Sequence, residues 1–321
     1  AVMARAPLPG AKVAKLDDSK AKAVKGVKQV IALPTGVAVL ATGYWAAKKG
    51  RDALQVDWDL GANTGLNSAK VTAMLTEAAS APGAVALQVG SADAKGAKTI
   101  EATYEAPYLA HACMEPMNCT AWVKPDGVEI WAGTQSQGPV QGILSQVASV
   151  DPGKVKVNTM MLGGGFGRRF APDFVIDATL LSKISGAPVK LIYTREDDMA
   201  AGFYRPASVI KFSGGLSADG KATVLNAGVG SPSIMAASGF MKIPDNGVDT
   251  FAMEGIADHP YDIANQRLAY GRKEPGPSVW FWRSVGHSQN IFFMESFIDE
   301  MAAAAARTPI SSAAPCSTSS R

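Results

Sequence analysis

The most constraining stretch of this 321-residue chain is a glycine-rich loop. Four of the five residues in the segment 163–167 are glycine, and Phe166 is the exception. Because glycine has no side chain, the backbone N–H groups of such a loop can approach a rigid ligand closely. The apolar run 155–162 predicts a strand before the loop, and a helix is predicted from Pro172 after it. A strand, a glycine loop and a helix are a common setting for an anion or a cofactor.

Three further motifs accompany the glycine loop. Taken alone, the loop is weak evidence for a binding site. It lacks the Gly-Lys-Ser/Thr ending of a P-loop, and Arg168 interrupts the pattern Gly-x-Gly-x-x-Gly. A glycine-rich turn packed against another backbone would explain it equally well. The other motifs are His-Ala-Cys-Met-Glu-Pro at 111–116, Thr-Gln-Ser-Gln-Gly at 134–138 and Phe-Trp-Arg-Ser-Val-Gly-His-Ser-Gln at 281–289.

In this order, the four motifs resemble the molybdenum-binding large subunit of the xanthine dehydrogenase and aldehyde oxidase family. The wording at 114–121, 163–169 and 281–289 looks most like its isoquinoline 1-oxidoreductase beta-subunit branch. The resemblance runs from near the start of the chain to about residue 308. Because the family's large subunit continues beyond these motifs, we expect this chain to be a fragment of it.

The resemblance implies an α+β fold in two parts. Residues 1–80 are expected to form part of a hammerhead-like α/β small domain, with a linker at 81–83. Residues 84–307 are expected to form the first part of a molybdopterin-binding domain with mixed sheets and packed helices. Residues 308–321 are mostly small and polar, so they cannot bury enough apolar surface to order themselves, and we expect a disordered tail there.

Capping residues, turn residues and apolar spacing predict the individual elements. The predictions that bear on the candidate site are helices at 68–80, 172–185 and 291–306, strands at 27–33, 37–42 and 155–162, and hairpins turning at 124–127 and 218–221.

Composition argues against several classes of function. Hydrophobic residues make up 47% of the chain and charged residues 18%, so its bulk is expected to be globular. A net charge of +3 gives no basis for nucleic-acid binding, and no apolar run is long enough to span a membrane. The three cysteines are too few for an iron–sulfur cluster and form no zinc-like set. We expect small buried thiols at Cys113 and Cys119, with a disulfide between them as the alternative.

The resemblance implies a molybdenum–pterin cofactor, as molybdopterin or its cytosine dinucleotide. The protein is expected to hold it by hydrogen bonds and not by metal ligands. By resemblance, the side-chain amide of Gln135 and the backbone N–H of Gly167 address the oxo group on the metal, and the Arg283 backbone approaches the same place. The residues expected to bind the cofactor are Gln135, Gly165, Phe166, Gly167, Arg168 and Arg283.

Several of these residues also have an ordinary structural explanation. On spacing alone, Gln135 fits a surface hydrogen-bonding residue, Phe166 a core residue and Arg283 one half of an interface ion pair. Arg168 and its neighbour fit either a phosphate contact or an exposed pair of charges. The resemblance makes a geometric prediction: Gln135 and Gly167 should point into one common space open to solvent, and Arg283 should border it.

The resemblance also implies oxidation of aldehydes or N-heteroaromatic compounds, with water as the oxygen source. Phe170 stands where xanthine-oxidising members carry a substrate-binding glutamate, which favours these substrates over purines. The family's general base is a glutamate in a later segment outside this chain, so we expect no catalytic residue here and no activity from the chain alone. The expected partners are a small [2Fe-2S] subunit, a cytochrome subunit and the small substrate.

Other interpretations remain open at this stage. The chain could be a non-catalytic binding or interaction module derived from the large subunit. Alternatively, His111, Glu115, His259 and His287 could belong to a hydrolytic metal site, although single histidines are more often structural. An unrelated hydrolase with a glycine-loop oxyanion hole is disfavoured because no Gly-x-Ser-x-Gly elbow appears.

Overall fold

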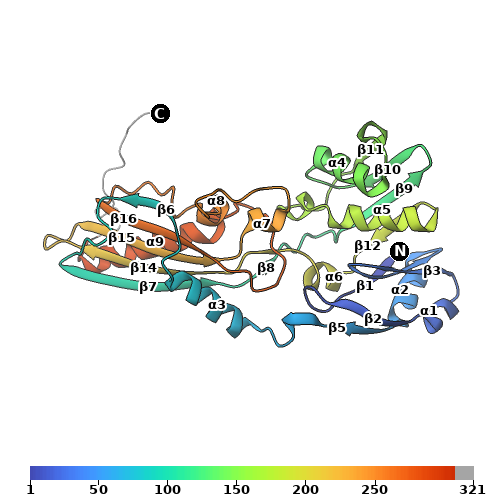
Figure 1. Cartoon of the computed structure of the whole chain (residues 1–321), viewed down its shortest axis with the longest axis horizontal. Coiled ribbons are helices and arrows are strands. Elements are labelled where there is room, and N and C mark those ends of the chain that lie inside the picture. The colour runs from blue at the N-terminus through green and yellow to red at the C-terminus, as the bar shows by residue number, and fades with distance from the viewer. Residues whose placement is uncertain (308–321) are drawn as a thin grey trace. The chain divides into compact units, whose positions relative to one another are not determined.

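The computed structural model describes residues 1–307, which fold into two compact α+β units (Figure 1). Neither unit is one continuous segment. The first consists of residues 1–65, 110–203 and 276–278, and the second of residues 66–109, 204–275 and those from 279 onward. The expected disordered tail lies outside the described residues, and the expected linker at 81–83 stays a prediction.

The N-terminal part of the first unit contains two small antiparallel sheets. Their strands are β1 (Val2–Arg5), β4 (Gly36–Ala41) and β3 (Val27–Leu33) in one sheet, and β2 (Lys12–Asp17) and β5 (Gln55–Asp59) in the other. The helices of this part are α1 (Ser19–Ala23), α2 (Tyr44–Asp52) and the short 3-10 turn η1 (Gly61–Asn63). Strand β4 is the central strand of the three-stranded sheet, and its residues Val37, Ala38 and Val39 are fully buried.

A four-stranded sheet with the order β11-β10-β9-β12 carries three of the four motifs of the sequence. Its strands are β9 (Asn118–Lys124), β10 (Gly127–Ala132), β11 (Val155–Thr159) and β12 (Val189–Ile192). The accompanying helices are α4 (Gln137–Ala148), α5 (Asp173–Ser185) and α6 (Arg195–Ala200), with 3-10 turns η2 (Pro152–Lys154) and η3 (Arg168–Phe170). Strands β10 and β11 are parallel, so both end at the same edge of the sheet, where the motif at 134–138 and the glycine loop begin.

The second unit is built on a five-stranded sheet with the order β6-β16-β15-β14-β7. Its strands are β6 (Ala84–Val89), β7 (Lys98–Ala106), β14 (Ser208–Leu216), β15 (Ala222–Ser231) and β16 (Asn265–Arg272). Its helices are α3 (Ser68–Ser80), α7 (Ile234–Ser238), α8 (Thr250–Met253) and α9 (His287–Ala304). Two short strands complete the chain, β8 (Leu109–Ala110) and β13 (Tyr204–Arg205).

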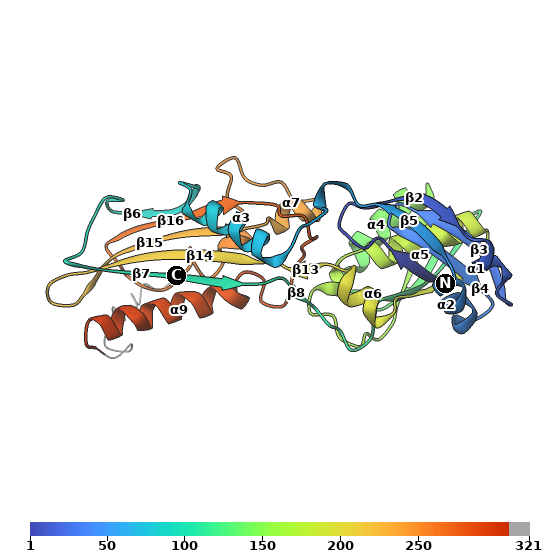
Figure 2. The ribbon, with the colours of Figure 1, turned by 90° about the horizontal axis from the view of Figure 1, so that it is seen from below.

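Helices α3 and α9 cover opposite faces of this sheet (Figure 2). Helix α3 lies directly against the backbone, because a Cβ atom at Gly228 or Gly230 would come within 2.0 Å of a carbonyl oxygen of α3. Helix α9 packs through apolar side chains, and the ring of Phe297 stacks on Phe212 with 4.7 Å between centroids. The two faces of the sheet are therefore closed by different means.

Most of the predicted elements are confirmed, including the helix at 68–80 and both hairpin turns. Helix α5 ends at Gly186, which adopts a left-handed conformation with φ 66°. The strand predicted at 155–162 is wrong at its end, because β11 stops at Thr159 and the next residues are exposed. Within residues 1–307, no helix is both long and apolar enough to cross a membrane.

Candidate functional site

The glycine loop is joined to the motif at 111–116 by paired hydrogen bonds. The Gly163 N–H donates to Oε2 of Glu115 across 2.9 Å, and the Glu115 N–H donates to the Gly163 carbonyl across 3.1 Å. A Cβ atom at Gly163 would lie 2.5 Å from Cβ of Glu115, so only glycine allows this approach. The Cys113 thiol donates to the Gly165 carbonyl across 3.4 Å. Cys113 and Cys119 are free and buried, which confirms the expected thiols and excludes the disulfide.

The motif at 134–138 contacts the same loop through Gln135. Its Oε1 accepts the Gly167 N–H across 3.1 Å, and its backbone N–H donates to the Arg169 carbonyl across 3.0 Å. A Cβ atom at Gly165 would lie 2.6 Å from Gln135 Oε1, so the amide lies on the glycine surface. The structure thus brings together Gln135, Gly165 and Gly167. In this structure Gln135 and Gly167 bond to one another, and their contact with a shared ligand stays a prediction.

Arg169 connects the three segments, although no definite role could be assigned to it from the sequence. Its Nε donates to the Gly164 carbonyl (2.8 Å), its Nη1 to the Gly133 carbonyl (3.2 Å), and its Nη2 to both the carbonyl (2.9 Å) and the carboxylate (2.7 Å) of Glu115. The Arg169 residue is 0% exposed. Burial acts to raise the pKa of Glu115, but the hydrogen bonds from Gly163 and Asn118 and the charge of Arg169 hold it below its ordinary value.

Arg168 is also buried, so the alternative of an exposed pair of charges is wrong. Its Nη1 and Nη2 donate to the two carboxylate oxygens of Asp173 across 2.8 and 2.7 Å. Burial would raise the pKa of Asp173, but the adjacent guanidinium lowers it below its ordinary value. Among the described residues, Nε of Arg168 is buried without a hydrogen-bond partner.

The loop and its neighbouring motif expose a rim of apolar side chains. Met161 is 98% exposed and Met114 is 87% exposed, while Phe166 is exposed over 43% of its surface. Phe166 adopts a left-handed backbone conformation with φ 53°, which is uncommon for a bulky residue. Such conformations occur preferentially at functional sites. The interpretation of Phe166 as a core residue is therefore wrong.

Arg283 belongs to the second unit and is exposed there. Ser284 and Val285, the next two residues, both have left-handed backbones, with φ 71° and 47°. Nearby, the Trp282 indole N–H and the Gln289 amide oxygen are buried and lack hydrogen-bond partners within the described part of the chain. Strain and unpaired polar atoms therefore gather in this motif. Whether Arg283 borders the space near Gln135 stays a prediction.

The histidines are held by ordinary partners. His111 Nδ1 lies 3.2 Å from the Phe203 carbonyl, and His259 Nε2 lies 2.7 Å from the Gln266 amide oxygen. His287 lies between two carboxylates. Across residues 1–307, no group of three or more His, Cys, Asp or Glu side chains is arranged to hold a metal ion, so the hydrolytic metal interpretation has no structural support there.

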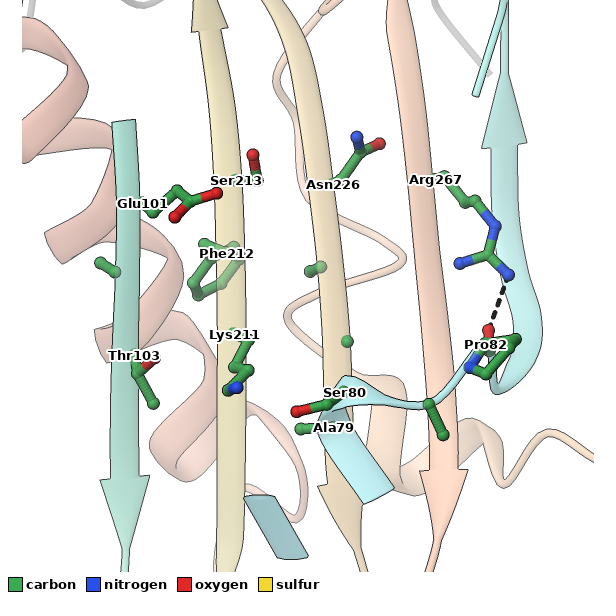
Figure 3. A pocket seen from close by; sticks show the side chains of 14 residues that line it. Ala79, Ser80, Pro82, Glu101, Thr103, Lys211, Phe212, Ser213, Asn226 and Arg267 are labelled. Atoms are coloured by element: carbon green, nitrogen blue, oxygen red, sulfur yellow. Dashed lines mark hydrogen bonds between the residues drawn. The ribbon is translucent and has the colours of Figure 1, made fainter. Parts of the chain in front are cut away.

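The second unit also contains an open polar hollow of about 510 Å³ on the sheet face beside the end of α3 (Figure 3). Glu101, Lys211, Asn226 and Arg267 line it, and Arg267 donates to the Pro82 carbonyl across 2.6 Å. None of the six predicted cofactor residues lines this hollow.

Comparison with known proteins gives a consistent result. The family model described as a molybdopterin cofactor-binding domain matches residues 79–311. The membrane-bound aldehyde dehydrogenase (pyrroloquinoline-quinone) of Gluconacetobacter polyoxogenes is 31% identical over 313 residues, which is 91% of this chain and 40% of that protein. The isoquinoline 1-oxidoreductase subunit beta of Brevundimonas diminuta is 27% identical, over 94% of this chain and 40% of that protein.

Solved structures show the same fold. The aldehyde oxidoreductase from Desulfovibrio gigas matches 96% of this chain and 39% of its own with a TM-score of 0.75 at 17% identity. Quinoline 2-oxidoreductase from Pseudomonas putida 86 matches with a TM-score of 0.71 at 16% identity, over 96% of this chain and 45% of its own. These matches confirm the expected fold class. The chain spans about 40% of the length of the first curated relatives it matches.

Proposed function

This chain belongs to the molybdopterin cofactor-binding domain family of the xanthine dehydrogenase and aldehyde oxidase type, and on that basis we propose that it is the first cofactor-contacting part of a molybdenum hydroxylase large subunit. The whole subunit would oxidise aldehydes or N-heteroaromatic compounds with water as the oxygen source. Names of relatives support this substrate class, since they include an aldehyde dehydrogenase, an isoquinoline oxidoreductase and a nicotinate dehydrogenase.

The observation that supports the proposal most is a set of unpaired hydrogen-bond donors on the glycine loop. The N–H groups of Gly164, Gly165 and Phe166 donate to no atom of residues 1–307. The amide nitrogen of Gln135 likewise has no partner in that part of the chain, while its oxygen accepts the Gly167 N–H. Neutral N–H donors without protein partners suit the oxygen atoms of a metal oxo group or a phosphate. The residues present therefore fit the cofactor.

Each residue would have a defined task. Gln135 would donate from its amide nitrogen, and Gly165 and Gly167 from their backbones. Arg168, whose guanidinium is buried and held by Asp173, would contribute its positive charge. Phe166 would present its exposed ring to the cofactor or to the substrate, and Arg283 would contribute its backbone, as the resemblance implies. When bound, the cofactor supplies a redox-active metal that accepts the electrons of substrate oxidation.

We further propose that these electrons pass to a small [2Fe-2S] subunit and onward to a cytochrome subunit. Several relatives are named as subunits, which supports a function within an assembly. The alternative is a non-catalytic binding module with the same fold and no cofactor. The almost fully exposed side chains of Met114 and Met161 are compatible with either assignment, since exposed apolar patches mark interaction sites.

Metal and pterin analysis distinguishes these assignments. We expect the chain, produced in a host that makes molybdopterin, to contain molybdenum and pterin in equal amounts. Gln135→Ala should lower both, whereas Gln146→Ala, at an exposed position of α4, should leave them unchanged. If the purified chain contained neither metal nor pterin, this result would favour the non-catalytic module. If the purified chain contained pyrroloquinoline quinone and no molybdenum, the quinone named for the aldehyde dehydrogenase of Gluconacetobacter polyoxogenes would be favoured as the cofactor.

A further inference from the structure

The turn that follows Arg283 has an unusual backbone. Two consecutive non-glycine residues, Ser284 and Val285, adopt left-handed conformations. Valine disfavours this conformation strongly, because its branched Cβ crowds the adjacent carbonyl oxygens. The Val285 N–H donates to the Trp282 carbonyl across 2.6 Å, which closes the turn. A conformation of this kind persists only where the surrounding structure holds it in place.

The segment 251–258 supplies that support from one side. The Gly286 N–H donates to Oε2 of Glu254 across 3.1 Å, and the Asn290 amide donates to the carbonyls of Ala252 and Glu254 across 2.9 and 2.8 Å. A Cβ atom at Gly286 would lie 2.1 Å from the Phe251 carbonyl oxygen, so the two backbones are in direct contact. These contacts fix the start of α9 against the loop after α8.

His287 contacts both carboxylates of this segment. Its Nε2 lies 2.9 Å from Oδ2 of Asp258, and its Nδ1 lies 3.4 Å from Oε2 of Glu254. The other oxygen of Asp258 accepts the Gly255 N–H across 2.5 Å. Burial raises the pKa of Glu254. Burial would also raise the pKa of Asp258, but the hydrogen bonds from Gly255 and His287 lower it.

We propose that His287 positions the Arg283 turn by hydrogen bonding to Asp258 through Nε2 while its Nδ1 lies against Glu254. Glu254 caps the helix start, because it accepts the Gly286 N–H. Asp258 instead accepts the Gly255 N–H and contacts the imidazole of His287, so it acts on the side chain and not on the helix backbone. By fixing the imidazole, it limits the backbone conformations open to the residues directly before His287. This role for His287 rests on the proposed contact of the Arg283 backbone with the cofactor.

Amide hydrogen exchange on the full chain tests the positioning role without the cofactor. In His287→Ala, the amides of Val285 and Gly286, which are hydrogen-bonded in the turn, should exchange about tenfold faster, as expected when a hydrogen bond to a charged group is lost. His287→Gln, which keeps one donor, should exchange at an intermediate rate. Phe292→Ala, at an exposed position of the same helix, should match the unsubstituted chain. Strands β15 and β16 serve as the internal reference for global unfolding.

The outcomes separate this role from the proposed function. Unchanged exchange of the turn in both His287 variants would overturn the positioning role. Faster exchange of β15 and β16 together with the turn would also overturn it, because it would show general destabilisation. Faster exchange confined to the turn, with unchanged pterin content in His287→Gln, would support positioning and contradict the proposed contact of Arg283 with the cofactor.

Discussion

The backbone N–H of Gly167 donates to the side-chain oxygen of Gln135 across 3.1 Å, although 32 positions separate the two residues. The bond joins two loops that leave the same edge of the sheet after the parallel strands β10 and β11. The missing side chain of Gly165 makes room for the Gln135 amide. The glycine loop and the motif at 134–138 are therefore joined through backbone groups and one side-chain amide.

Gly165→Ala should destabilise the first unit by about 0.5–1.5 kcal/mol, because the new Cβ atom would displace the Gln135 amide and break its hydrogen bond with the Gly167 N–H. Denaturant unfolding measures this difference. Gly142→Ala is the matched control, since a Cβ atom added there would meet nothing within 4 Å and the residue belongs to helix α4. That substitution should stabilise the chain by roughly 0.5–1 kcal/mol. Equal effects of the two substitutions would be inconsistent with the described packing of Gln135.

Arg169→Lys should cost about 2–3 kcal/mol of stability, because a lysine ammonium cannot reach the carbonyls of Gly133, Gly164 and Glu115 together. Arg272→Lys is the control, since Arg272 and its partner Glu274 are both well exposed. Its effect should stay within about 0.5 kcal/mol. If the free energies of unfolding of the two variants differed by less than about 0.5 kcal/mol, Arg169 would not hold the three segments together.

The hydrogen bonds of Glu115 predict a dependence of stability on pH. Because its pKa in the folded chain lies below the ordinary 4.5, the carboxylate stabilises the fold above that pH. This stabilisation should be lost as the pH falls through the lower folded value. Glu115→Gln should be less stable than the unsubstituted chain at neutral pH and should approach it in acid. Parallel pH profiles of the two chains would contradict this assignment.

The isolated chain should not oxidise aldehydes or N-heteroaromatic compounds with an artificial electron acceptor. The general base implied by the resemblance has no counterpart among the proposed site residues, so proton abstraction would lack its acceptor. Turnover assays with cofactor-loaded chain measure this directly. Cofactor-dependent turnover above background would disprove the prediction.

Local signals predicted the elements better than they predicted the site. Asn67 caps α3 by accepting the Lys70 N–H, and such caps are visible in sequence. The early end of β11 could not be predicted, because the chain turns out of the sheet so that Gly163 bonds to Glu115. Glu115 lies far from Gly163 in the sequence, so local patterns do not indicate this contact. The role of Arg169 was missed for the same reason, since its partners are backbone carbonyls from three segments. The only sequence feature that pointed to Arg169 was its position in a pair of arginines directly after the glycine loop.

The division into units was equally hidden from local patterns. Each unit combines segments from both halves of the chain, and strand pairing such as β6 with β16 joins residues that lie far apart in sequence. Periodicity reports which residues face a core, but it does not report which strands share that core. Only the family resemblance placed Gln135 and Gly167 at one site.

A structure of the cofactor-loaded protein tests the central claim most directly. We predict that the bond between Gln135 and Gly167 opens, and that the Gln135 amide nitrogen and the Gly167 N–H then both lie about 3 Å from oxygen ligands of the molybdenum. A bound cofactor elsewhere, with the 3.1 Å bond between Gln135 and Gly167 intact, would contradict it.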